Sequence, residues 1–323
     1  MRTVVRATLL SFSLLAAPIS VPAATAAAPA GITTVGPSAQ AQARSYWTPS
    51  RLRAAVPVEK LMPKATLRST LPVRLGAPAV VQPTAAAAAP VNAGSAWTFG
   101  GAIVKTEGRV FFLYGGRKAS CSGTAVTSAN KSTVITAGHC VRLGGAWHTN
   151  WVFVPAYNNG TAPYGTWTAR LTSALPQWVA SESFSYDVGA AVVDSLGGKL
   201  LTDVVGGQGI TFSSALLKQV YAFGYPAAAP YDGTKLIYSS GAAVLAIPLF
   251  SDGYGLVSNL TGGASGGGWF QSFDPATGRG LLTSVNSYKI ALSNLGVPLD
   301  VPAIFGPKFG ADTQTLYNAM QKA

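Results

Sequence analysis

Three residue types that together perform nucleophilic catalysis occur at widely separated positions in this chain. One of its two histidines, His139, lies in the string TAGHC, Asp187 precedes an apolar run, and Ser265 lies among five glycines in GGASGGG. A serine hydroxyl becomes a nucleophile when a base removes its proton, and an acid fixes the tautomer of that base. The sequence therefore predicts a hydrolase with Ser265 as nucleophile, His139 as base and Asp187 as orienting acid.

The glycines around Ser265 also suit the charge that such a reaction develops. They permit a sharp turn and leave backbone N–H groups free, and we expect those of Gly263 and Ser265 to form an oxyanion hole. The string also fits the nucleophile elbow of α/β-hydrolases, but that fold orders its triad serine, acid, histidine. Both histidines of this chain precede Ser265, so the elbow is excluded, provided that the usual chain order holds.

Two alternatives exist for the base and the acid. His148 lies in a polar, loop-like stretch, and we expect its side chain to be solvated. Asp194 ends the apolar run that Asp187 begins, and it lies in a turn-like Asp-Ser-Leu-Gly-Gly sequence. Asp187 is therefore the better placed acid.

The first residues are typical of an export signal. Arg2 and Arg6 are followed by an apolar stretch over 7–17, and small residues at 24–26 suit a cleavage site. This predicts a signal peptide over 1–26 and a secreted, extracellular product. The apolar stretch is too short to span a bilayer, so we expect no membrane partner.

Export places the two cysteines, Cys121 and Cys140, in an oxidising compartment, where a disulfide is expected. The bridge would close a 19-residue separation and contribute about 3 kcal/mol in the chain-entropy view. The alternative is a cysteine nucleophile paired with the adjacent His139. It is weaker, because sequence neighbours rarely face each other for proton transfer and a secreted thiol oxidises.

The formal net charge of +12 is concentrated in the N-terminal part of the chain. Residues 1–95 hold nine Lys or Arg and a single acid, Glu59, whereas residues 96–323 hold fourteen bases and ten acids. No basic cluster with interleaved aromatic residues follows residue 95, which argues against nucleic-acid binding.

Composition divides the chain after the signal peptide into two parts. Residues 27–95 are predicted to be a pro-segment and linker: the part before 76 is basic and poor in strand patterning, with a flexible tail as the alternative, and 76–96 is rich in Ala, Pro and Val. Residues 96–323 contain twelve short apolar runs with turn residues between them, typical of an all-β sandwich or barrel pair. The runs are 109–114, 120–126, 132–136, 151–155, 166–171, 188–193, 220–225, 235–239, 242–247, 255–258, 268–270 and 281–286.

The end of the chain is predicted to be helical over about 312–321, with Asp312 as N-cap and Leu316 and Met320 on one face. No cofactor is implied, and no clustered ligands for a metal are seen.

Several strings resemble a known family. CSGTAV at 121–126 and VITAGHC at 134–140 look like the first half of chymotrypsin-family serine endopeptidases. FGYP at 223–226 and TGGASGG at 261–267 resemble the secreted bacterial branch that contains the glutamyl endopeptidases, and the Tyr-Trp-Thr-Pro leader at 46–49 is similar to pro-segments of actinobacterial members. The resemblance covers about residues 105–290.

The resemblance implies a disulfide between the two cysteines and a fold of two packed antiparallel β-barrels, about 96–205 and 206–310. His139 and Asp187 would come from the first barrel, and Ser265 from the second. Two features depart from the family. Ala264 stands where animal trypsin-like enzymes carry an aspartate, and no histidine follows the serine as in the glutamyl endopeptidases.

By the same resemblance, Asn259 would form the floor of the specificity pocket, with Thr261 beside it. A wall would come from the strand 281–286, represented by Thr283 and Ser284. None of these is acidic, and an unpaired buried charge costs several kcal/mol, so cleavage after Lys or Arg is disfavoured. We expect cleavage after a small or medium uncharged substrate residue. An acidic substrate residue is the second choice, if the freed N-terminal amine of the enzyme reaches the pocket.

The resulting expectation is a secreted, monomeric serine endopeptidase that hydrolyses polypeptides and whose mature chain starts between about Leu75 and Trp97. An exported esterase with the same triad and a catalytically silent binding protein on the same fold remain open.

Overall fold

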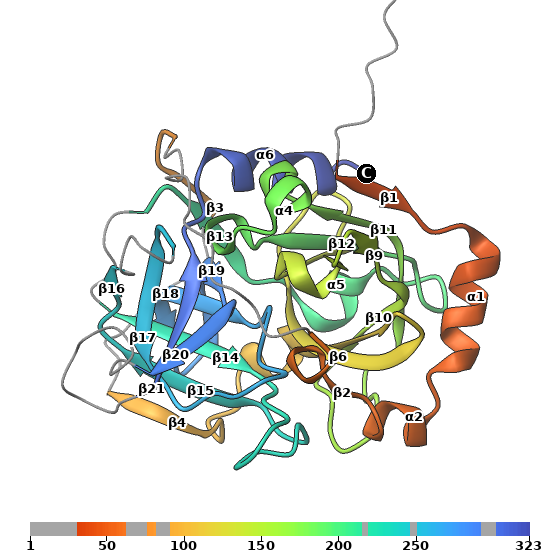
Figure 1. The fold of residues 1–323 in the computed structure, drawn as a ribbon, viewed down its shortest axis with the longest axis horizontal. Helices are drawn as coiled ribbons and strands as arrows, with labels where there is room; N and C mark the ends of the chain where they lie inside the picture. Colours follow the sequence, from red (N-terminus) through yellow and green to blue (C-terminus); the bar gives the residue numbers. More distant parts are fainter. Residues whose placement is uncertain (1–30, 63–75, 82–90, 215–218, 246–250, 292–301) are drawn as a thin grey trace, which may run out of the picture.

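The computed structural model describes residues 31–62, 76–81, 91–214, 219–245, 251–291 and 302–323. The predicted signal peptide over 1–26 lies outside these residues. Two β-rich halves lie side by side, and a C-terminal helix crosses their outer face (Figure 1). Each of the twelve predicted runs contains a strand, so the all-β prediction is confirmed. None of the helices in the described ranges has the length and apolar character that a membrane crossing requires.

The first half contains a closed barrel of six antiparallel strands. Alternating and continuous apolar residues form these strands, and their buried side chains belong to the larger hydrophobic core, which extends into the second half through residues such as Phe223 and Phe270. Strand β11 pairs with both β10 and β12, which closes the barrel. In barrel order the strands are β10 (Thr149–Pro155), β5 (Glu107–Tyr114), β6 (Arg117–Ala125), β7 (Thr133–Thr136), β12 (Gly189–Val193) and β11 (Trp167–Ala174).

The second half consists of two sheets. The larger has the order β3 (Ala79–Val81), β13 (Gly209–Phe212), β19 (Arg279–Val285), β18 (Gly268–Asp274), β14 (Val220–Gly224), β15 (Ile237–Gly241) and β4 (Asn92–Ala96). The smaller has the order β16 (Val244–Leu245), β17 (Gly253–Val257), β21 (Pro302–Pro307) and β20 (Tyr288–Ala291). Strands β13, β20 and β21 were not predicted, because they are short or carry proline at their ends.

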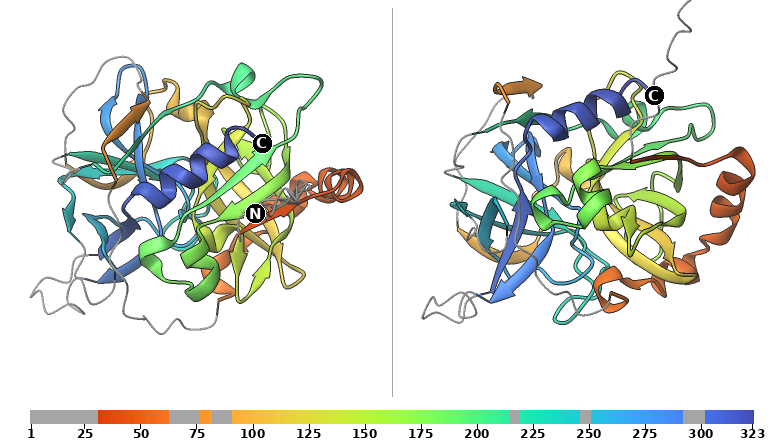
Figure 2. Two further views of the ribbon diagram at one scale, coloured as in Figure 1. Left: turned by 90° about the horizontal axis from the view of Figure 1, so that it is seen from above. Right: turned by 45° about the horizontal axis from the view of Figure 1, so that its top comes forward.

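The C-terminal helix α6 (Ala311–Met320) contacts strands of both halves, as the view from above shows (Figure 2). Its buried residues include Leu316 and Met320, as predicted. Its N-cap is Gly310 and not Asp312, which lies in the first turn and accepts a hydrogen bond from Gln177 Nε2 at 2.9 Å.

Short elements connect the barrel strands and place the residues discussed below. They are α3 (Ile103–Thr106), η2 (Gly138–Cys140), β8 (Arg142–Leu143), β9 (Ala146–Trp147), α4 (Pro176–Ser181), η3 (Phe184–Tyr186) and α5 (Leu201–Val205).

The described part of the N-terminal region, 31–62, is folded against the first barrel, so a flexible tail is wrong for these residues. Its first three elements, β1, α1 and α2, follow the right-hand side of Figure 1, and β2 lies near the centre of that view. Strand β1 pairs with β11, and β2 pairs in parallel with β6. The elements are β1 (Ile32–Thr34), α1 (Pro37–Tyr46), α2 (Pro49–Arg53), β2 (Val56–Pro57) and η1 (Val58–Lys60).

The stretch predicted as a linker, 76–96, contains strands β3 and β4. β3 forms one edge of the larger sheet of the second half, and β4 forms the other. The polar sequence of β4, Asn-Ala-Gly-Ser-Ala, has no apolar alternation, so its strand conformation comes from pairing with β15 rather than from its own pattern.

Candidate active site

His139 and Asp187 form a buried pair beside the end of β7 and the start of β12. Strand β7 ends at Thr136, three residues before His139, and its pairing with β12 sets Gly189 opposite Thr136, which brings the two side chains together. His139 Nδ1 lies 2.7 Å from Asp187 Oδ2, and the His139 backbone N–H donates to Asp187 Oδ1 at 2.8 Å. His139 is 1% exposed and Asp187 is 0% exposed, so the pair is shielded from water. Asp187 therefore fixes the ring so that Nε2 is the atom left for proton transfer.

A third side chain, that of Ser287, reaches this pair from the second half. Its Oγ donates to Asp187 Oδ2 at 2.6 Å, so that Asp187 accepts three hydrogen bonds. The sequence carries no pattern that singles out this serine, because its role depends on how the two halves meet.

The pKa of His139 is raised above its ordinary value. Burial lowers it most strongly, but the charge of Asp187 and the hydrogen bond to it raise the pKa, with smaller contributions from Glu59 and Glu182. The imidazolium that forms during proton transfer is therefore stabilised by the buried carboxylate.

Ser265 lies in a crowded glycine loop held by the first barrel. Its carbonyl accepts from the Ser122 N–H at 2.7 Å, and Ser122 Oγ donates to the Gly263 carbonyl at 2.9 Å. Gly263 and Gly266 have φ of +95° and +81°, a region that disfavours side chains. A Cβ on Gly266 would lie 2.1 Å from Thr136 Oγ1. The loop thus fixes the serine next to the end of β7, where His139 follows.

An acid from the N-terminal region contacts the serine. Glu59, in η1, accepts hydrogen bonds from Ser265 Oγ through Oε1 and from the Gly263 N–H through Oε2, the latter at 3.0 Å. Its Oε1 lies 3.9 Å from His139 Nε2. Sequence reasoning did not assign this residue a role, although Glu59 is the only acid in residues 1–95.

His148 differs from the expectation of a solvated side chain. It is buried, its ring stacks on Phe112 at 4.1 Å between centroids, and its Nε2 lies 2.9 Å from the His139 carbonyl oxygen. Burial lowers the pKa of His148 to about 4, and the hydrogen bond to His139 opposes this only in part. The hairpin of β8 and β9 folds the polar stretch back onto the barrel, so His148 supports the backbone of His139.

Asp194, the alternative acid, is partly exposed and lies 3.8 Å from Arg44 Nη2 of the N-terminal region. Among the described residues, Asp194 forms no hydrogen bond or ion pair with His139, in contrast to Asp187.

The disulfide between Cys121 and Cys140 is confirmed, with the two Cα atoms 6.1 Å apart. These cysteines and His139 form the one cluster of potential metal-ligating residues within the described ranges. Disulfide sulfurs are not thiolates, and His139 Nδ1 is bonded to Asp187, so the donor chemistry of this cluster does not suit a metal.

The expected pocket residues separate into two groups. Asn259 and Thr261 are partly exposed and directly precede the glycine loop; Asn259 Oδ1 accepts from the Tyr231 hydroxyl at 2.6 Å, and Thr261 Oγ1 donates to the Ala228 carbonyl at 2.6 Å.

Thr283 and Ser284, expected as a wall of the pocket, lie in strand β19. Both are buried within β19, and Ser284 Oγ donates to the Pro307 carbonyl at 2.7 Å. After β19, Asn286 Nδ2 donates to the Ala264 carbonyl at 2.9 Å beside Ser265, and Ser287 reaches Asp187.

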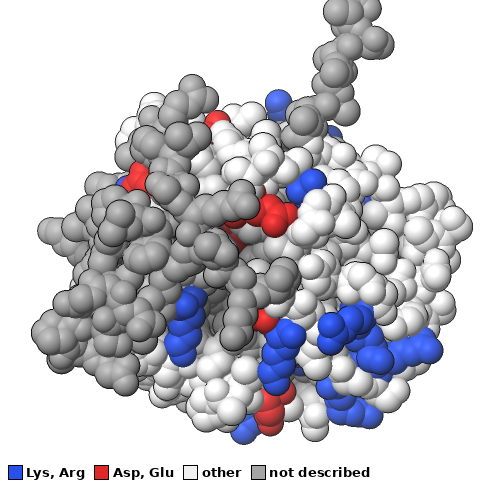
Figure 3. Space-filling model, in the orientation of Figure 1, with Lys and Arg blue, Asp and Glu red and all other residues white. Residues whose placement is uncertain are grey.

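Basic side chains cluster on the surface outside the candidate site. Lys and Arg gather over α2 and its neighbours on the face shown in Figure 3, where Arg51 and Arg53 are exposed.

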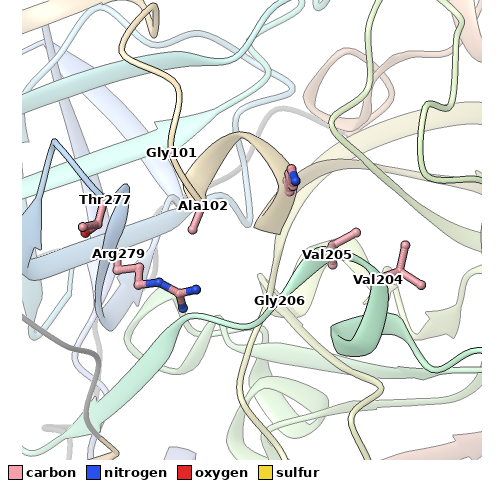
Figure 4. Close-up of a pocket in the computed structure, with 8 residues that line it drawn as sticks. Gly101, Ala102, Val204, Val205, Gly206, Thr277 and Arg279 are labelled. Atoms are coloured by element: carbon pink, nitrogen blue, oxygen red, sulfur yellow. The ribbon is translucent and has the colours of Figure 1, made fainter.

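A pocket of about 500 Å³ lies between α3, α5 and the β18–β19 hairpin (Figure 4). It is lined by Gly101, Ala102, Lys105, Val204, Val205, Gly206, Thr277 and Arg279, and so is separate from the His139–Asp187 pair.

Comparison with solved structures finds similar proteins over most of the described chain. The protease Anisep from Arthrobacter nicotinovorans is 43% identical, with a TM-score of 0.62 over 69% of this chain and 98% of that one. A thermostable serine protease, AL20, from an extremophilic microorganism is 36% identical, with a TM-score of 0.61 over 69% and 99%. A Glu endopeptidase, at 15% identity and a TM-score of 0.55, shares the fold alone.

Among curated proteins, an extracellular metalloprotease of Bacillus subtilis (strain 168) is 35% identical over 71 residues. This chain spans 22% of that protein's length, and the match covers 22% of this chain. No family model matches the sequence.

Proposed function

Because the chain belongs to the bacterial chymotrypsin-like serine proteases, we propose that it is a secreted endopeptidase that cleaves polypeptides through Ser265, His139 and Asp187. The observation that carries the proposal is the buried 2.7 Å contact between His139 Nδ1 and Asp187 Oδ2, beside a glycine loop that carries Ser265. Two proteases at 43% and 36% identity support the hydrolytic class.

In the proposed reaction, Ser265 Oγ attacks the scissile carbonyl while His139 Nε2 accepts its proton. Asp187 holds the imidazolium, and the N–H groups of Gly263 and Ser265 stabilise the oxyanion. His139 then protonates the leaving amine, and water, deprotonated by His139, hydrolyses the acyl-enzyme. The Gly263 N–H already donates to a carboxylate oxygen, that of Glu59, which supports its proposed role as an oxyanion donor.

We further propose that the chain is made as a precursor. The signal peptide over 1–26 directs export, and a second cleavage between about Leu75 and Trp97 releases the N-terminal region. We call the chain cleaved there the processed enzyme. The disulfide suits an oxidising compartment.

Peptide turnover by the processed enzyme tests this function. Ser265→Ala should lower kcat by at least about three orders of magnitude, because the triad acts as a unit. Ser181→Ala, an exposed serine of α4, is the matched control and should leave kcat unchanged. Retention of a tenth of the wild-type turnover by Ser265→Ala would refute the assignment, and turnover of esters without peptides would replace it with an esterase.

A further inference from the structure

The carboxylate of Glu59 occupies the position where the reaction needs its substrate. One oxygen receives the Gly263 N–H at 3.0 Å, and the other receives the hydroxyl of Ser265. A tetrahedral intermediate would direct its oxyanion at the same N–H and its new bond at the same Oγ. A carboxylate at this position therefore excludes a scissile carbonyl.

The same contact separates the nucleophile from its base. Ser265 directs its proton at Glu59, and His139 Nε2 is buried without a hydrogen-bond partner among the described residues. General-base catalysis requires a hydrogen bond between these two groups. With this bond unmade and the oxyanion donor occupied, the chain in this conformation is inactive.

We propose that residues 31–62 are an intramolecular inhibitor of the protease and that Glu59 is its inhibitory group. The inference rests on the proposed function and adds how that function is held off. A carboxylate suits this role because, unlike a peptide carbonyl, it offers no bond that Ser265 can cleave: an ionised carboxylate is a poor electrophile, and it has no amine to release.

The residues directly before Glu59 fix its position. Val56 and Pro57 pair in parallel with Ala119 and Ser120 of β6, and Ser120 directly precedes Cys121 of the disulfide. Val58 is completely buried, so η1 cannot rotate without exposing it. The Glu59 side chain is 32% exposed, so its carboxylate lies at the surface of the site and not within the core.

The other residues of 31–62 bind the first barrel at positions away from Ser265. Strand β1 extends the barrel sheet at β11, and Trp47 is buried against Phe111 with its Nε1 donating to the Asn150 carbonyl at 2.7 Å. Arg44 donates to Thr168 Oγ1 at 3.0 Å and lies 3.8 Å from Asp194. Such a pre-organised segment presents Glu59 to the site at a high effective concentration while the chain is intact.

The charge pattern of the segment agrees with this role. The other charged residues in 31–62 are all basic, so Glu59 is the only anion that the segment can offer to the oxyanion donors. Loss of the hydrogen bonds that this carboxylate accepts should weaken the contact about ten- to a hundredfold.

The test measures how fast a fluorophosphonate probe labels the intact precursor, with the chain length checked by mass. We expect the intact wild-type chain to react at least about tenfold more slowly than the processed enzyme. Glu59→Ala should speed labelling of the intact chain at least tenfold, and Glu59→Gln, which keeps an acceptor without the charge, should fall between. Lys60→Ala, the exposed neighbour of Glu59, is the matched control and should match wild type.

Equal labelling of intact wild-type and Glu59→Ala chains overturns the proposal. A processed enzyme that neither reacts with the probe nor cleaves peptides instead refutes the proposed function, so the two failures are distinguishable.

Discussion

At the scale of single residues, the candidate site combines the buried His139–Asp187 pair with Ser265, the proposed nucleophile, on a separate loop. Asp187 accepts hydrogen bonds from the backbone and ring of His139 and from Ser287. The bond from His139 Nδ1 keeps the proton on that nitrogen and leaves Nε2 as the acceptor in neutral His139. Only neutral His139 accepts a proton, so the activity of the processed enzyme should rise with pH as the imidazolium loses its proton.

Asp187→Asn should change both the rate and its pH dependence. We expect kcat to fall by about four orders of magnitude, because the amide favours the wrong tautomer of the ring. The rise in kcat/KM should move to lower pH, since the charge that raises the pKa of His139 is lost while burial still lowers it. The measurement is kcat/KM against pH for the processed enzyme.

Asp194→Asn is the matched control for this experiment, because Asp194 is the other acid of the same run and contacts Arg44 instead of the histidine. It should leave the rate and the pH profile unchanged. An unaltered profile in Asp187→Asn would contradict the assigned cause of the pKa shift.

At the scale of elements, the glycine loop shows why a serine in this chain is held rigidly. Gly266 combines a positive φ with a close approach to Thr136 Oγ1 and the Ser122 carbonyl, both in the first barrel. The loop therefore depends on strands β6 and β7, which also carry the disulfide and lead into His139.

Gly266→Ala should destabilise the protein at least about 2 kcal/mol more than Gly197→Ala does. Both glycines have positive φ, of +81° and +59°, but a Cβ on Gly197 meets nothing within 4 Å, whereas on Gly266 it meets Thr136 Oγ1 at 2.1 Å. Backbone strain alone costs about 1 kcal/mol, and the clash adds to it. Chemical denaturation of both variants on a Ser265→Ala background measures the difference. Equal destabilisation would show that the loop yields freely.

The elements also show what could be predicted from sequence. His139, Asp187 and Ser265 could be proposed from sequence because histidine is rare here and the flanking strings are specific, and the structure places His139 in contact with Asp187. Ser287 and the buried state of His148 were not, since both depend on where strands return after long connections. Glu59 had one signal, its isolation among basic residues, but a composition count does not reveal that it reaches a serine 206 positions away.

At the scale of the whole molecule, the two halves meet through buried polar contacts as well as apolar ones. Glu107 of β5 accepts hydrogen bonds from Thr124 Oγ1 at 2.5 Å and from the Gly268 N–H of the second half at 3.2 Å. Its Oε2 is buried without a partner in the described chain. Burial raises the pKa of Glu107 from 4.5 to about 8, against the two hydrogen bonds that lower it. The carboxyl is therefore neutral at pH 7.

This raised pKa makes stability depend on pH in a defined direction. Below pH 4.5 the carboxyl is neutral in both states; between 4.5 and about 8 only the unfolded chain ionises, so the free energy of unfolding falls as pH rises. The whole shift corresponds to about 5 kcal/mol at most. Glu107→Gln, neutral throughout, should gain several kcal/mol relative to wild type between pH 5 and pH 8, measured by denaturation on a Ser265→Ala background. Parallel stability profiles would show that Glu107 is ionised in the folded protein.

The mapping of a covalent probe tests the central claim most directly. The processed enzyme is treated with a fluorophosphonate, digested and analysed by mass spectrometry. We predict one adduct per chain, on Ser265, which is absent from Ser265→Ala and forms much more slowly in His139→Ala because the base is lost. An adduct on another residue, or peptide cleavage at the wild-type rate by chains fully modified at Ser265, would contradict the account.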